Sequence, residues 1–296
     1  MKWFQIEEQS AGEKRLILSW YLYKIFGKNI LYFIAFLVSF FTFICSKKIR
    51  LFSKKYFTVI SNYTNLKPTL VNSFRLIYSY ACSLVDKMLI YSGDFDTDNL
   101  LFDKEEDKEN LFAEIKNNKG LFFICSHIGN IEVMQGLFLN KNTRINNDVN
   151  IFLSNRQSQI FNSFLKKIQL DFPLKLYPVE DIGLNTGLEL KENLDKGGIV
   201  FIAGDRLAEN NDTQNIQTEM FSRKIFLPKG TFKLAKLMEV PVYFVAVIKI
   251  GKNYKIYLEK QHNLSESELI SAYIKYLEKI ILINPFQFFH FYDFFN

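Results

Sequence analysis

From residue 104 onward, short apolar runs alternate with segments of helical pattern. The apolar runs are rich in β-branched and aromatic residues and lie at 121–125, 149–154, 174–177, 199–203 and 242–248. The helical patterns lie at 104–117, 131–139, 156–168, 184–195 and 229–238. Apolar strands that alternate with helices predict an α/β fold, with a mostly parallel central sheet flanked by helices on both faces. We expect 254–259 to add an edge strand and 265–282 to form a closing amphipathic helix.

The first 92 residues follow a different pattern, which predicts an N-terminal helical membrane-anchoring segment. Residues 30–45 are a run of sixteen without a charge, and 47–85 look helical with a break near 66–68. A membrane span normally needs about 20 apolar residues, so a span, a helix in one leaflet and a buried core helix are all open at this length. Basic residues flank the run on both sides: Lys24, Lys28, Lys47, Lys48, Arg50, Lys54 and Lys55.

The charge distribution supports a division into residues 1–92, a membrane-associated region, and residues 93–296, an α/β domain. Residues 1–60 carry ten Lys and Arg against three Asp and Glu, a net charge of +7, whereas the other 236 residues carry 27 against 28. A basic, apolar N-terminus on a neutral body favours a membrane surface, and not nucleic acid, as the partner. The denser basic cluster follows the apolar run, which predicts that the body lies on the cytoplasmic side.

Polar residues directly follow three of the predicted strands. These residues lie where a ligand is expected, because open α/β sheets bind ligands beyond the carboxyl ends of their strands. We therefore expect one shared site from the three segments 126–132, Asn155-Arg156 and Gly204-Asp205-Arg206.

His127 and Glu132 are the candidate catalytic pair. On a continuous helix a five-residue spacing would place their side chains about 140° apart. They can meet if His127 ends a strand, Gly129 and Asn130 form a turn, and Glu132 begins a helix. A carboxylate on one imidazole nitrogen fixes the tautomer and leaves the other nitrogen as a base. Such a base suits proton removal from a hydroxyl that attacks an activated acyl group. A structural histidine is the alternative that the spacing alone leaves open.

The other strand-end residues have two interpretations. Arg156, Asp205 and Arg206 are either structural ion pairs or contacts to phosphate or phosphopantetheine, for which arginine's forked donors are suited. Backbone amides after Gly129 are candidates to stabilise an oxyanion. The sequence has no nucleotide-binding motif, and its cysteines and histidines have no metal-ligand spacing, so we expect neither a metal nor a cofactor.

The stretch 121–138, LFFICSHIGNIEVMQGLF, resembles the His-x4-Asp/Glu block of the lysophospholipid acyltransferase superfamily. More narrowly, it resembles the bacterial lipid A biosynthesis (late) acyltransferase family. Asn155-Arg156, Gly204-Asp205-Arg206, Phe221-Ser222-Arg223 and the tail 284–294 are also similar to that family. Two departures concern the acceptor: isoleucines replace the usual aromatic residues at 128 and 131, and Gly-Asp-Arg replaces the common Asp-Gln form.

The resemblance implies a membrane-bound enzyme that transfers a fatty acyl chain from acyl carrier protein, or from CoA, to a hydroxyl of a lipid A-type or related glycolipid. It implies an inner-membrane location, with 93–296 as the catalytic domain on the cytoplasmic face. His127 resembles the general base and Glu132 the carboxylate that orients it. The implied substrate contacts are Asn155, Arg156, Gly204, Asp205 and Arg206. A catalytically silent lipid-binding or membrane-scaffold protein of the same fold is the alternative.

Overall fold

The computed structural model describes residues 13–91, 100–139, 148–154, 163, 174–207 and 215–295. Its main sheet has seven strands in the order β1-β9-β8-β2-β5-β3-β4. The strands are β1 (Leu100–Phe102), β2 (Leu121–Cys125), β3 (Val149–Leu153), β4 (Leu174–Pro178), β5 (Ile199–Ala203), β8 (Val242–Ile250) and β9 (Asn253–Gln261). Strands β8, β2, β5, β3 and β4 run parallel, while β9 and β1 run in the opposite direction. The predicted α/β fold with a mostly parallel sheet is confirmed.

All five apolar runs that predicted strands are strands of this sheet. The predicted edge strand at 254–259 lies within β9, but it is not at the edge, because β1 pairs with its outer side. A separate hairpin of β6 (Asn215–Met220) and β7 (Arg223–Pro228) was not expected. Its turn places Phe221 and Ser222 at φ of 51° and 56°, without the Asn-Gly pair that usually signals such a turn.

Helices cover both faces of the sheet. They are α5 (Glu105–Lys116), α6 (Glu132–Leu139), α8 (Leu184–Asp195), α9 (Lys229–Leu237) and α10 (Glu266–Ile283), and short 3-10 turns occur at Val179–Asp181 (η4) and Pro285–Gln287 (η6). All five agree with the predicted helical segments. The remaining predicted helix, 156–168, lies outside the described residues except for Ser163.

Strand β2 shows why helices are needed on both faces of the sheet. All five of its residues are buried, as expected for a central strand covered on both sides. Phe122 and Ile124 belong to the core cluster that contains α9 and α10, whereas Phe123 and Cys125 belong to the cluster that contains α5 and α6. Successive side chains of a strand point to opposite faces, so this one strand fixes two hydrophobic layers.

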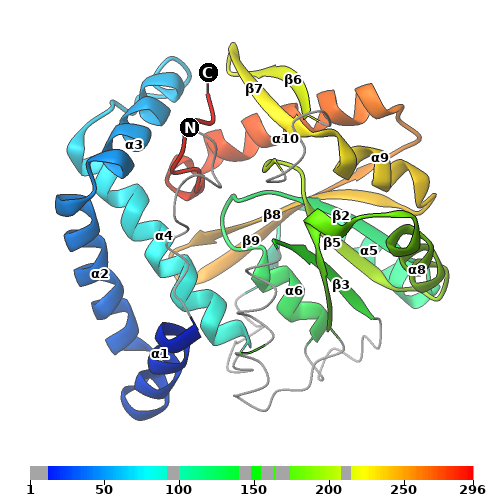
Figure 1. Cartoon of the computed structure of the whole chain (residues 1–296), viewed down its shortest axis with the longest axis horizontal. Helices are drawn as coiled ribbons and strands as arrows, with labels where there is room; N and C mark the ends of the chain where they lie inside the picture. The colour runs from blue at the N-terminus through cyan, green and yellow to red at the C-terminus, as the bar shows by residue number, and fades with distance from the viewer. Residues whose placement is uncertain are drawn as a thin grey trace.

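Four N-terminal helices lie along one side of the sheet, coloured blue to cyan in Figure 1. They are α1 (Glu13–Phe26), α2 (Lys28–Cys45), α3 (Lys47–Ile60) and α4 (Leu70–Tyr91). The predicted break near 66–68 falls between α3 and α4. Helix α4 packs against α2, α6 and η6, so it joins the N-terminal helices to the sheet. The predicted domain boundary at residue 92 lies outside the described residues.

Helix α2 has the length and apolar composition of a membrane span, the only helix in the described part of the chain that does. It has 18 residues with a mean hydropathy of 1.9. Three of its residues, Leu31, Ala35 and Ser39, are buried. Its exposed apolar side chains are Phe33, Phe36, Leu37, Val38, Phe40, Phe41 and Ile44. Most of the apolar surface of α2 therefore lies on the outside of the protein.

The register between β2 and β5 brings two functional segments together. Cys125 lies opposite Ala203, the last residue of each strand, so the residues that follow leave the sheet side by side. The Gly204 N–H donates to the Cys125 carbonyl at 2.9 Å. A Cβ on Gly204 would lie 2.9 Å from both Ile124 and Tyr273, so the close approach of these residues requires glycine.

The turn between His127 and α6 depends on Gly129. Its φ is +66°, and a Cβ there would lie 1.9 Å from the carbonyl oxygen of Val247. The Gly129 N–H donates to the Gln287 carbonyl at 2.8 Å, and the Phe289 N–H donates to the His127 carbonyl at 2.9 Å. The turn is thus held between β8 and the C-terminal segment.

We expect Gly129→Ala to lower the free energy of unfolding by clearly more than the ~1–2 kcal/mol that a left-handed backbone alone costs a non-glycine residue, because the new methyl group also clashes with Val247. Gly251→Ala is the matched control: Gly251 has a φ of +64°, and no other atom lies within 4 Å of the place that a Cβ would take. Urea unfolding of the purified protein, followed by circular dichroism, measures both losses. Equal losses of unfolding free energy in the two variants would show that the close approach of Val247 does not require glycine at position 129.

Candidate active site

His127 and Asp205 form the centre of the candidate active site. His127 follows β2 and Asp205 follows β5, and the register of these strands places them next to each other. The His127 Nδ1 atom lies 2.9 Å from Asp205 Oδ1, and the His127 backbone N–H donates to Asp205 Oδ2 at 2.6 Å. The Asp205 side chain is 0% exposed, whereas the imidazole of His127 is 31% exposed. The pair therefore joins a buried carboxylate to an imidazole that solvent reaches.

The charge state of Asp205 fixes the tautomer of His127. Burial raises the pKa of Asp205, but attraction to His127 and His290 and their hydrogen bonds outweigh it and hold the pKa well below its ordinary value. An ionised carboxylate can only accept hydrogen bonds, so the Nδ1 of His127 must carry a proton. The Nε2 of His127 then carries the lone pair, and no described residue forms a hydrogen bond with it. It is therefore able to act as a base.

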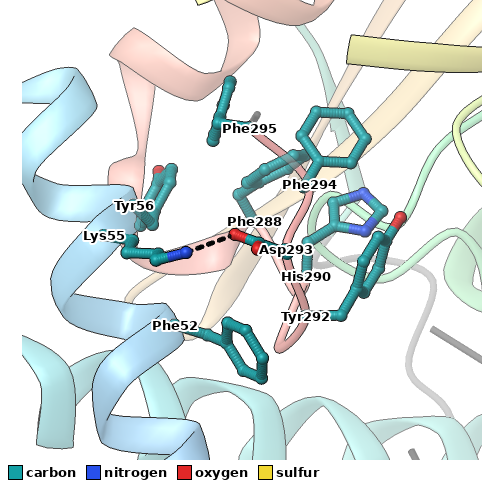
Figure 2. Close-up of a pocket in the computed structure, with 9 residues that line it drawn as sticks. All are labelled: Phe52, Lys55, Tyr56, Phe288, His290, Tyr292, Asp293, Phe294 and Phe295. Carbon is teal, nitrogen blue, oxygen red and sulfur yellow. Dashed lines mark hydrogen bonds and ion pairs between the residues drawn. The ribbon is translucent and has the colours of Figure 1, made fainter. Parts of the chain in front are cut away.

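His290 is a second histidine on the same carboxylate, and the sequence pattern did not indicate it. Its Nε2 lies 2.9 Å from Asp205 Oδ2. Figure 2 shows its ring among aromatic side chains of the C-terminal segment. The ring stacks on Phe294 at 4.4 Å and contacts Phe288 at 4.3 Å and Tyr292 at 5.1 Å, between ring centres. Burial lowers the pKa of His290 to about 4, against the opposing attraction of Asp205. His290 is thus neutral at pH 7 and donates its Nε2 proton to Asp205.

One feature of the sequence could have indicated that His290 belongs to the site. Six of the ten residues 286–295 are phenylalanine, a composition that predicts burial, and a histidine buried there needs a polar partner. The tail reaches Asp205 because Phe288 forms an antiparallel bridge with Ile128, next to His127. An ion pair of 2.7 Å between Lys55 on α3 and Asp293 holds the same tail from outside (Figure 2).

Glu132 opens α6, as predicted, but its carboxylate does not hydrogen-bond to His127 in the described structure. It forms an ion pair with Lys87 of α4. Burial raises the pKa of Glu132, but Lys87 and, to a smaller extent, His127 lower it below its ordinary value. We expected Glu132 to accept a hydrogen bond from the imidazole, but Asp205 accepts it, because β2 and β5 end side by side. Glu132 acts on His127 through its charge.

The predicted substrate contacts have different outcomes. Asp205 has both carboxylate oxygens occupied by the two histidines, so it faces the imidazoles and not a substrate headgroup. Gly204 is buried and allows the close packing described above. Arg206 is half-buried, and its Nη2 donates to the Phe289 carbonyl at 3.5 Å. Asn155 and Arg156 lie outside the described residues.

Two backbone amides of the turn before α6, where we expected stabilisation of an oxyanion, are already used. The Gly129 N–H donates to Gln287 and the Asn130 N–H donates to Val247, each at 2.8 Å. The reason is that the C-terminal segment and β8 flank the turn on its two sides, which the sequence pattern did not indicate. These two amides are therefore structural.

The three residues of the His127–Asp205–His290 cluster are also spaced as metal ligands would be, with one ligand atom from each within 4.8 Å of the others. Both carboxylate oxygens, however, already accept hydrogen bonds at 2.6–2.9 Å. A cation would have to displace the protons that both imidazoles donate to Asp205. It would also compete with the His127 backbone N–H for Asp205 Oδ2. Hydrogen bonding accounts for the arrangement without a cation.

No model of a known protein family matches the chain, and no curated protein is significantly similar to it. The chemistry of the site therefore carries the functional argument. A partly exposed imidazole with a fixed tautomer, backed by a buried ionised carboxylate, is an arrangement able to remove a proton from a hydroxyl and return it to a leaving group.

The buried His290 predicts a pH dependence of stability. In the unfolded chain histidine titrates near 6.5, and in the folded protein His290 titrates at about 4. Between these values the unfolded chain binds more protons, so stability is fully present above pH 6.5 and falls toward pH 4, with a slope of up to ~1.4 kcal/mol per pH unit. We expect His290→Gln, which keeps a donor but cannot be protonated, to flatten this slope in urea unfolding.

The matched control is His262→Gln, because His262 is exposed. We expect its slope between pH 6.5 and pH 4 to equal that of the unmodified protein. If His290→Gln also kept the full slope, His290 would not be a buried neutral imidazole.

Proposed function

We propose that the protein is a membrane-bound O-acyltransferase that uses His127 as its general base. The observation that carries the proposal is the hydrogen bond between His127 Nδ1 and Asp205, at the ends of adjacent parallel strands. This bond leaves Nε2 unprotonated, on an imidazole that is 31% exposed. Transfer of an acyl chain between a thioester and a hydroxyl needs such a base and no protein nucleophile.

In the proposed reaction, Nε2 of His127 takes the proton of the acceptor hydroxyl as its oxygen attacks the thioester carbonyl carbon. The tetrahedral intermediate collapses, the C–S bond breaks, and the ester C–O bond remains. The leaving thiolate takes the proton back from His127, so the enzyme returns to its starting state. Asp205 and the nearby Glu132 stabilise the transient imidazolium, because both are negatively charged.

The proposed location is the cytoplasmic face of the inner membrane. Its support is the exposed apolar surface of α2 together with the basic residues on both sides of that helix. Helix α4 contacts both α2 and α6, and its Lys87 pairs with Glu132. The candidate active site is therefore directly connected to the helices that would meet the bilayer, which suits a lipid acceptor.

The proposed substrates follow from the resemblance described above. The donor is an acyl thioester of acyl carrier protein or CoA, and the acceptor is a hydroxyl of a lipid A-type or related glycolipid. Gly204, Asp205 and Arg206 would position the reacting groups only indirectly, through the buried network around Asp205. Asn155 and Arg156 remain predicted substrate contacts.

We expect His127→Ala to abolish acyl transfer from acyl carrier protein, since loss of a general base typically costs ~10²–10⁴-fold in rate. Asp205→Asn should lower kcat by a similar factor, because an amide no longer fixes the tautomer, and Glu132→Ala should lower it through loss of the negative charge. A radiolabelled acyl-transfer assay on purified protein measures these rates. His262→Ala is the control variant and should keep full activity.

Full activity of purified His127→Ala would refute the proposal. The lipids of cells that lack the protein give the independent comparison by mass spectrometry. One lipid class that lacks an acyl chain agrees with an acyltransferase, whereas an unchanged lipid composition favours a catalytically silent lipid-binding protein.

A further inference from the structure

A second concave site lies between the N-terminal helices and the sheet. It is a groove of about 900 Å³, lined by residues of α1, α2 and α4, by the turn between β8 and β9, and by the segment around η6. Asn130 and Gln287 contribute to one wall, which is the same backbone that holds the turn after His127. None of the described lining residues belongs to the His127–Asp205–His290 cluster. The groove is therefore a separate site.

The groove is strongly basic. Four basic residues line it and Asp86 is its single acidic lining residue, which gives a net charge of +3. Asp86 is neutralised, because Lys249 Nζ lies 2.9 and 2.8 Å from its two carboxylate oxygens and Tyr32 also donates to it. The other three basic residues, Lys28, Arg75 and Lys252, form no ion pair within the described structure. An anion in the groove would meet three unneutralised positive charges.

Arg75 is held in a suitable position for an anion. Its guanidinium lies 4.0 Å from the ring centre of Phe286, a cation–π contact that leaves the edge of the guanidinium able to donate. Arginine's planar donors match two oxygens of a phosphate at once. Neutral groups that donate and accept hydrogen bonds, Ser79 and Asn284, also line the groove. This chemistry fits a phosphate group with attached hydroxyls.

The surroundings of the groove indicate a lipid as the source of that phosphate. Lys28 and Tyr32 of α2 line the groove, whereas Phe33, Phe36 and Leu37 on the same helix are exposed. An anion bound in the groove therefore lies next to an uncovered apolar surface. A molecule with a phosphate at one end and hydrocarbon at the other satisfies both surfaces together.

We propose that this groove binds the phosphate-bearing headgroup of an anionic membrane lipid, with the acyl chains along the exposed face of α2. Arg75, Lys28 and Lys252 contact the phosphate, and Lys249 stays paired with Asp86. The site orients the protein on the bilayer at a place distinct from His127. The proposal does not depend on acyl transfer, because lipid binding is measurable without it.

The test uses the full chain in dodecyl maltoside, titrated with dihexanoyl phosphatidylglycerol and, separately, with dihexanoyl phosphatidylcholine, by isothermal titration calorimetry. We expect a single site that binds phosphatidylglycerol about tenfold or more tightly than phosphatidylcholine. The double variant Arg75→Gln/Lys252→Gln should weaken phosphatidylglycerol binding by about tenfold or more. Both residues are exposed, so the fold should persist, and circular dichroism checks this.

The matched control is Lys116→Gln/Lys119→Gln, which removes the same charge from exposed positions at the carboxyl end of α5, a helix that does not line the groove. We expect it to bind phosphatidylglycerol as the unmodified protein does, and we expect the same of His127→Ala, which separates this site from catalysis. Equal binding of the two lipids, or equal weakening by the two double variants, would overturn the proposal. Inorganic phosphate that binds as tightly as the lipid would also overturn it, because the hydrocarbon would then contribute nothing.

Discussion

A charged carboxylate buried in a protein interior costs several kcal/mol unless hydrogen bonds and opposite charge compensate it, and Asp205 is such a group. Its compensation comes from three hydrogen bonds, supplied by two parts of the chain that are distant in sequence. The β2–β5 register brings His127 to it, and the aromatic C-terminal tail brings His290. Strand register, the Gly129 turn and tail docking are therefore coupled through one side chain, and a change in any of them disturbs the orientation of His127.

The N-terminal helices extend this network toward the apolar surface. Lys87 of α4 forms an ion pair with Glu132 close to His127, and α4 also lines the basic groove through Arg75, Ser79 and Asp86. A single helix thus borders both the candidate active site and the proposed lipid site. This arrangement gives the exposed apolar surface of α2 a fixed position relative to His127, as the proposed reaction between a soluble acyl donor and a bilayer-embedded acceptor would require.

The sequence predicted the parts of the fold that depend on local pattern. Apolar strands, the α3–α4 break and the strand–turn–helix around Gly129 were all visible in the order of residues. Strand β1 was missed because three residues carry no periodicity, and the β6–β7 hairpin because its turn lacks glycine. His127 was identified from its place after a strand. The hydrogen-bond partner of His127 was not identified: it is Asp205, which the pairing of β2 with β5 brings to the imidazole, and not Glu132. His290 reaches Asp205 only because a distant tail docks there. Both are long-range contacts, which residue spacing does not encode.

The most direct test of the proposed mechanism is the protonation of the His127 ring, since the chain has only three histidines. Nitrogen NMR of protein labelled with ¹⁵N-histidine, at pH 8 in detergent, distinguishes the two neutral tautomers, and His127→Gln assigns the signals. The mechanism predicts a protonated Nδ1 and an unprotonated Nε2 for His127, with loss of this preference in Asp205→Asn. A His127 ring protonated on Nε2, or one that is unaffected by Asp205→Asn, would contradict it.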